Sequence, residues 1–119
     1  MSDRILSSYL NNNYPVYADL HTHSISSGHG SADTVTDMIQ YAAHSGLSIL
    51  GISEHGPATA GSARASYFQN LKLASRSRFG IRILYGVELN IITAAGDVDL
   101  EDSILSTLDY AIISIHPPS

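Results

Sequence analysis

Short, β-rich apolar runs alternate along this chain with segments of helical periodicity. The apolar runs cover residues 14–20, 47–53, 81–89 and 110–115. Helices are expected at residues 3–12, 33–44 and 101–108, a loop followed by a helix at 61–78, and a hairpin at 90–100. Because strands that alternate with helices build parallel sheets, this pattern predicts an α/β fold of about four βα units.

The length of the chain limits how much of such a fold it can build. Its 119 residues suffice for one domain, but a complete (β/α) barrel usually needs about 200 residues or more. The sequence ends at Pro117-Pro118-Ser119, with no helix to cover the last predicted strand. We therefore expect residues 1–119 to form the N-terminal part of a single barrel domain, with the C-terminal half absent.

The composition excludes several classes of protein. There is no cysteine, so disulfides, thiolate metal sites and cysteine nucleophiles are ruled out. The net charge of −5 makes nucleic acid an improbable partner, because a non-specific grip on its backbone needs clustered basic residues. The sequence shows neither an apolar run of about 18 residues nor the pattern of a signal peptide. We expect a cytoplasmic protein with no membrane partner.

Most of the six histidines stand where a predicted strand ends. His21 and His23 follow the first strand and, if they continue it, both imidazoles face one side. His55 follows the second strand, Glu88 lies at the end of the third, and His116 lies at the end of the fourth. Active sites of βα folds lie at this end of the strands, and imidazole binds several divalent metals. A metal site is one interpretation, and a set of structural polar residues is the other.

Two histidines lie elsewhere. His29 is in a Gly-His-Gly loop from which it could reach the same end of the sheet, although its position alone favours an ordinary loop histidine. His44 falls in the last turn of the helix at 33–44, just before Gly46. A cation there stabilises the helix dipole and can cap carbonyl groups, so we interpret His44 as structural.

Four short motifs follow one another along the chain. They are Asp19-Leu20-His21-Thr22-His23-Ser24, Ile52-Ser53-Glu54-His55-Gly56-Pro57, Gly86-Val87-Glu88-Leu89-Asn90-Ile91 and Ile113-Ser114-Ile115-His116. In this order they resemble the PHP (polymerase and histidinol phosphatase) family of metal-dependent phosphoesterases, and most of all its small bacterial stand-alone phosphatases. The resemblance covers nearly the whole chain, from about Tyr14 to Pro118.

The resemblance implies a distorted (β/α)7 barrel with a trinuclear metal centre at the carboxyl ends of the strands. Carried over by position, the implied ligands are His21, His23, His29, His55, Glu88 and His116, with Glu88 bridging two ions. The expected cofactors are divalent ions, up to three per complete site, zinc foremost, with iron or manganese as alternatives. Members of the family also carry a histidine on a later strand and a further Asp-x-His pair near the end of the domain, and these 119 residues contain neither of these two features.

The implied reaction is hydrolysis of a small phosphomonoester by a metal-activated hydroxide. Besides Glu88, two residues are candidates for the catalytic site. Asp19 either orients a ligand histidine or merely ends a strand, and Arg64 either holds the substrate phosphate or is a solvated surface residue. Two rival interpretations stay open: a PHP-type nuclease or polymerase-associated exonuclease module, and an inert truncated fragment that lacks the remaining ligands.

The last predicted strand, residues 110–115, is apolar on both faces, as interior parallel strands are. It carries no charged residue that would discourage pairing with another strand. We therefore expect its free edge to meet a second copy of the chain, forming a homodimer, or to be covered by further chain.

Overall fold

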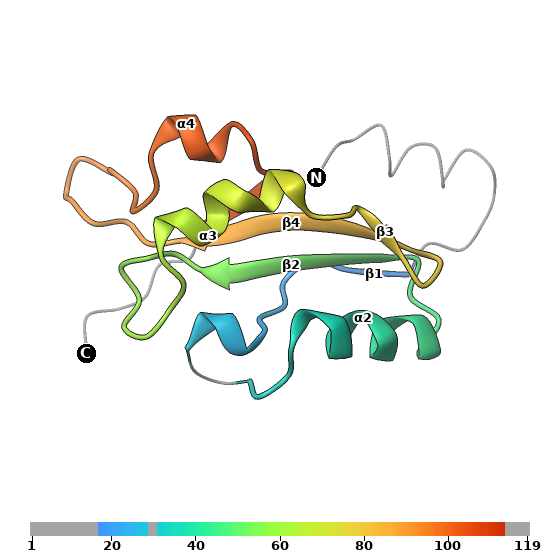
Figure 1. The fold of residues 1–119 in the computed structure, drawn as a ribbon. Helices are drawn as coiled ribbons and strands as arrows, with labels where there is room; N and C mark the ends of the chain where they lie inside the picture. Colours follow the sequence, from blue (N-terminus) through green and yellow to red (C-terminus); the bar gives the residue numbers. More distant parts are fainter. Residues whose placement is uncertain (1–16, 29–30, 114–119) are drawn as a thin grey trace.

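The structure is a computed structural model that describes residues 17–28 and 31–113 (Figure 1). The strands are β1 (Ala18–Asp19), β2 (Ile49–His55), β3 (Ser77–Arg78), β4 (Ile81–Leu89) and β5 (Tyr110–Ile113). The helices are α2 (Val35–His44), α3 (Ala65–Asn70) and α4 (Asp102–Leu105), with short 3₁₀ turns η1 (Ile25–Ser27) and η2 (Leu71–Leu73). The predicted helix at 3–12 lies outside the described residues, as do parts of the first and last predicted strands.

The strands form one sheet in the order β1-β2-β4-β3, with β5 also paired to β4. β1, β2, β4 and β5 run parallel, which confirms the expected α/β class and gives the parallel part of a (β/α) barrel. β3 was not predicted and pairs antiparallel with the start of β4. Phe79 and Gly80 join these two strands, and both have positive φ angles, 52° and 77°. Such angles suit the two-residue turns that close hairpins.

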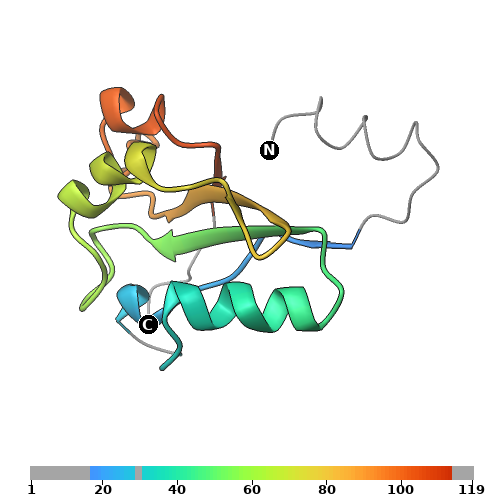
Figure 2. The ribbon, with the colours of Figure 1, turned by 45° about the vertical axis from the view of Figure 1, so that its right-hand side comes forward.

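The helices cover one face of this sheet, where the core lies. Figures 1 and 2 show α2 alongside β2 and α3 alongside β4, with α4 next to α3. Alternate residues of β2 and β4, such as Ile52 and Val87, pack against Ile39 of α2 and Phe68 of α3 in one buried apolar cluster. Since neighbouring strand residues point to opposite faces, the alternate set that includes His55 and Glu88 points away from the helices.

The helix predicted at 33–44 ends at His44 as expected and begins at Val35, two residues later than predicted. Thr34 is the N-cap of α2, and it forms a reciprocal capping box with Asp37. Gly46 follows the helix with a φ angle of +83°, as expected for a residue just beyond a helix end. Within the described part of the chain, no helix is long and apolar enough to cross a membrane.

Other predicted boundaries differ from those observed. Of the strand predicted at 14–20, residues 14–16 lie outside the described residues, and β1 covers Ala18–Asp19; just beyond its end the Asp19 carboxylate accepts the His21 backbone N–H (3.2 Å). β2 extends to His55 rather than ending at residue 53. α4 spans four residues instead of 101–108, and two hydroxyls near its end bond back to main-chain carbonyls. The predicted hairpin at 90–100 has one antiparallel bridge, Ile91 to Val98.

Candidate metal centre

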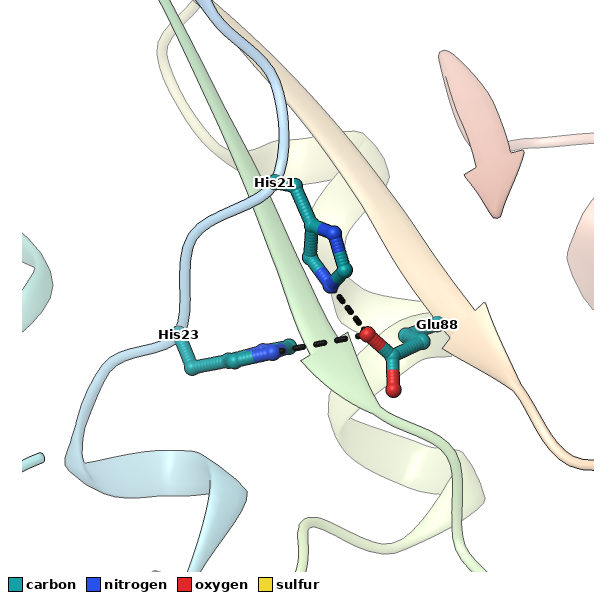
Figure 3. A group of neighbouring side chains, drawn as sticks. All are labelled: His21, His23 and Glu88. Atoms are coloured by element: carbon teal, nitrogen blue, oxygen red, sulfur yellow. Dashed lines mark hydrogen bonds and ion pairs between the residues drawn. The ribbon is translucent and has the colours of Figure 1, made fainter. Parts of the chain in front are cut away.

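Three histidines and one glutamate converge at the carboxyl ends of β2 and β4. Glu88 is the register partner of His55 across the two strands, and its Oε2 lies 2.9 Å from His55 Nδ1. Its other oxygen, Oε1, is in contact with His21 Nε2 and lies 3.5 Å from His23 Nε2. Figure 3 shows His21 and His23 pointing from the segment after β1 toward Glu88 on β4. One carboxylate is therefore shared by three imidazoles.

His21 and His23 reach this place from the segment that follows β1, and their imidazoles point into one space, as the sequence analysis expected. β1 ends at Asp19, and the next residues run alongside β2 through side-chain as well as main-chain bonds. The Thr22 carbonyl accepts the Ser53 N–H (2.9 Å), and the Thr22 hydroxyl donates to the Gly51 carbonyl (2.6 Å). The two histidines on either side of Thr22 are thereby fixed beside the ends of β2 and β4.

The ring of His23 stacks on that of His55, with centroids 4.1 Å apart and planes inclined by 19°. His21 meets His23 edge to face, with centroids 5.2 Å apart. Exposure falls from 52% for the His21 side chain to 24% for His23 and 10% for His55. The site is thus open to solvent on the His21 side and closed at its base.

Glu88 is the most buried member of the site, with 3% of its side chain exposed. Burial disfavours its charged form, but the hydrogen bond to His21 and the charges of His55, His21 and His23 outweigh that effect. The net result is a pKa below the ordinary value for glutamate. The carboxylate is therefore held ionised, as a metal ligand must be.

Comparison with known proteins assigns the chain that carries this site to a family. The family model described as "PHP domain" matches residues 19–117. The chain belongs to the PHP domain family. A probable phosphatase of Clostridium novyi (strain NT) is 38% identical over 100 residues, covering 84% of this chain and 41% of that protein. One of Thermoanaerobacter sp. (strain X514) is 43% identical over 98 residues, covering 82% and 40%. The chain thus spans about two fifths of the length of these curated relatives.

The side chains of this PHP domain fit a divalent metal ion. One potential ligand atom each from His21, His23 and Glu88 lies within 4.8 Å of the other two. Imidazole nitrogen and carboxylate oxygen are the donors that zinc, iron and manganese accept in proteins. In addition, Nδ1 of His23 is buried and has no hydrogen-bond partner among the described residues, as expected of a nitrogen that is available to a ligand.

The other site residues that the sequence analysis named fall into two groups. His29 and His116 lie outside the described residues. Asp19 ends β1, and its carboxylate contacts the main chain of His21 and not an imidazole. Its side chain lines a pocket of about 420 Å³ beside α2, together with Asp33 and Tyr41. That pocket is on the helix-covered side of β1 and is separate from the histidine cluster.

Arg64 and His44 are both exposed. Arg64 is the residue before α3 and makes no side-chain capping bond there. No hydrogen bond or ion pair within the described residues joins it to the histidine cluster. His44 is the last residue of α2, in agreement with its interpretation as a helix-end residue.

Sequence reasoning missed two carboxylates that shape the PHP site. Glu54 is fully buried in β2 and accepts hydrogen bonds from the segment after His23. Asp99 accepts from the backbone of Ala58 (2.9 Å) and of Asn90 (2.9 Å), and so links the turns that follow β2 and β4. Glu54 could have been found, because a carboxylate inside an apolar strand needs buried donors. Nothing in the sequence around Asp99 marks its role.

Proposed function

We propose that this chain is part of a metal-dependent phosphoesterase that hydrolyses small phosphomonoesters. The observation that carries the proposal is the convergence of three imidazoles on one buried carboxylate at the carboxyl ends of the strands of a PHP domain. The names of the relatives support the same chemistry, since each is called a probable phosphatase. The acidic net charge favours a small phosphorylated substrate over nucleic acid.

In this proposal His21, His23, His55 and Glu88 hold the metal, with zinc as the first candidate and iron or manganese as alternatives. A bound divalent ion would neutralise phosphate charge and lower the pKa of a coordinated water. Glu88 holds its negative charge at the base of the site. His21, as the exposed member, lies at the side from which a substrate enters. We keep His29 and His116 as proposed further ligands and Arg64 as a proposed phosphate contact.

Asp19 has a more indirect role in the same proposal. Its carboxylate accepts a hydrogen bond from the backbone N–H of His21 and so helps to fix the position of the His21 backbone. We therefore propose that Asp19 positions His21 through the main chain, without contact to substrate.

The test is release of phosphate from p-nitrophenyl phosphate with and without a chelator. A longer protein that contains this sequence should release phosphate, lose that activity in excess chelator, and regain it with a divalent ion. The 119 residues alone should release little, because the implied ligand set includes a later histidine and an Asp-x-His pair near the end of the domain, and they lack both. Activity that persists in excess chelator would rule the mechanism out. Faster cleavage of single-stranded DNA would favour the nuclease alternative.

A further inference from the structure

Glu54 is a buried carboxylate on the face of β2 opposite the histidines. It is 0% exposed, and within the described residues it forms no ion pair with a lysine or arginine. Its Oε1 accepts the Ser24 N–H (2.6 Å) and the Ser27 hydroxyl (3.0 Å), and its Oε2 accepts the Ser24 hydroxyl. A buried charge is costly unless hydrogen bonds compensate it. All three of these donors belong to one short segment, and the Tyr67 hydroxyl of α3 also interacts with the carboxylate.

That segment is the one that carries His23. Ser24 follows His23 directly and is the N-cap of η1, where its hydroxyl accepts the Ser26 N–H (3.2 Å). The three bonds from Ser24 and Ser27 therefore attach the chain just beyond His23 to β2. Both serines are themselves fully buried, so water does not compete for these bonds.

The same network also reaches His55, which is the chain neighbour of Glu54. The Ser27 hydroxyl donates to Glu54 and at the same time accepts the backbone N–H of His55 (3.0 Å). One carboxylate thus fixes the backbone next to both histidines of the stacked pair. The stack itself, at 4.1 Å, depends on these two backbones keeping their relative position.

We propose that Glu54 is a positioning residue for the metal centre: through Ser24 and Ser27 it holds the imidazoles of His23 and His55 in register beside Glu88. This inference rests on the proposed function, because it assumes that the histidines bind metal. Glu54 itself faces away from the site and touches neither metal nor substrate. An apolar residue of similar size would fill the space but would leave one buried N–H and two buried hydroxyls without an acceptor.

The test compares Glu54→Ala with Glu54→Gln. The alanine removes every acceptor, whereas the glutamine keeps one carbonyl oxygen for Ser24 and Ser27 and its amide can donate to the Ser24 hydroxyl. The matched control is Ile52→Val, a change in the same face of β2 that removes a buried methyl but no hydrogen bond. The probe is Co²⁺, whose affinity and visible absorption spectrum both report on the ligands. Each variant is measured at a temperature at which circular dichroism shows it folded.

We expect Glu54→Ala to weaken Co²⁺ binding roughly 10–100-fold, the usual cost of losing a residue that orients metal ligands, and to alter the absorption spectrum. Glu54→Gln should restore most of the affinity, and Ile52→Val should leave it unchanged. The proposal is overturned if Glu54→Ala binds Co²⁺ as the parent chain does. It is equally overturned if Ile52→Val loses as much affinity at a similar melting temperature.

Hydrogen exchange in the metal-free chain separates a failure of this inference from a failure of the proposed function. If the parent chain binds no Co²⁺, the metal role of this chain is refuted, and exchange then decides whether Glu54 holds the two histidine segments. Faster exchange at the Ser24 and His55 amides in Glu54→Ala, but not in Ile52→Val, supports the role of Glu54 in holding the two histidine segments. Unchanged exchange at both amides overturns it.

Discussion

At the scale of single residues, Tyr110 limits the size of the side chains that fit on the face of the sheet away from the helices. Its hydroxyl crosses from β5 to donate to the Leu20 carbonyl (2.6 Å), in the segment that carries His21. To do so the side chain passes over two glycines. A Cβ at Gly51 would lie 2.5 Å from the Tyr110 hydroxyl, and one at Gly86 would lie 2.7 Å from its ring. Both strands therefore need glycine where the tyrosine crosses.

We predict that Gly51→Ala destabilises the chain by about 1–3 kcal/mol, the usual cost of overpacking. Tyr110→Phe removes the hydroxyl that the new methyl group meets, so part of this cost should vanish in the double variant. Denaturant unfolding of the two single variants and the double variant gives the coupling free energy. Strict additivity would show that the close approach between Gly51 and Tyr110 does not determine stability.

The same scale shows how much of the site could be predicted. The gathering of His21, His23, His55 and Glu88 follows from their places near the ends of successive parallel strands, where side chains meet at one edge. Glu54 escaped prediction because its role depends on which loop packs over β2. That packing is a tertiary contact between residues 24–27 and 54, which no local periodicity encodes.

At the scale of elements, the ends of β2 and β4 are tied together by the turns that follow them. Asp99 accepts the N–H of Ala58 through Oδ2 and both the N–H and the side-chain amide of Asn90. A Cβ at Gly56 would lie 2.3 Å from the same carboxylate, so the turn after His55 fits closely around it. This link adds to the main-chain bond from the Gly56 N–H to the Glu88 carbonyl (2.9 Å), which also joins the two strand ends.

We predict that Asp99→Ala lowers the free energy of unfolding by about 1–3 kcal/mol, because it leaves main-chain donors without an acceptor. Asp99→Asn keeps one oxygen and should lose less. Asp97→Ala is the matched control, since Asp97 lies in the same loop and its carboxylate accepts a bond, within the described residues, only from the Thr93 hydroxyl. Thermal unfolding followed by circular dichroism measures the three variants. Equal losses for Asp97→Ala and Asp99→Ala would argue against the link.

Elements differ in how well the sequence predicts them, for physical reasons. β4 was predicted with the same ends that the structure shows, residues 81–89, because it is a long buried run paired on both sides. The start of the first predicted strand lies outside the described residues, and β1 ends one residue before the predicted end, where the Asp19 carboxylate accepts the His21 N–H. β3 is short and depends on the turn at Phe79 and Gly80, which the apolar pattern does not reveal.

At the scale of the whole molecule, the helices of the described residues, α2, α3 and α4, lie on one side of the sheet, and β5 lies at an edge of the described strands. Among the described residues β5 pairs only with β4, and Ile113 on β5 is 58% exposed. An apolar parallel strand with a free edge can pair with another chain. We therefore propose that the chain self-associates through β5.

Light scattering at increasing concentration should show this association, and Ile113→Lys should weaken it by placing a charge on the edge. Leu73→Lys is the matched control, because Leu73 is 80% exposed but belongs to the helical layer. A well-folded monomer at high concentration would contradict the proposal, as would equal effects of the two substitutions.

Two partly buried tyrosines, Tyr67 and Tyr110, predict a loss of stability at alkaline pH. Burial is the largest cause that raises the pKa of Tyr67 and of Tyr110 above the ordinary value of about 10, and the charge of Glu54 adds to it at Tyr67. The raised pKa belongs to the folded state. The stability that the two neutral tyrosines contribute is therefore fully present below the pKa of tyrosine in the unfolded chain. It is lost as the pH rises from about 10 toward the folded-state values.

Denaturant midpoints measured across this alkaline range should fall with increasing pH. The fall should be shallower in Tyr67→Phe, which has no hydroxyl to ionise. A midpoint that stays constant above pH 10, or a slope unchanged by the substitution, would contradict the assignment.

The most direct test of the metal centre is the equilibrium affinity of the chain for Zn²⁺, measured by competition with a chromophoric chelator. The account predicts that the parent chain binds Zn²⁺ and that His21→Ala weakens binding at least about tenfold, since even residues behind the ligands contribute about 10–100-fold. His44→Ala, which removes an exposed imidazole at the end of α2, should bind as the parent does. Absence of Zn²⁺ binding by the parent chain, or equal affinities for His21→Ala and His44→Ala, would contradict the account.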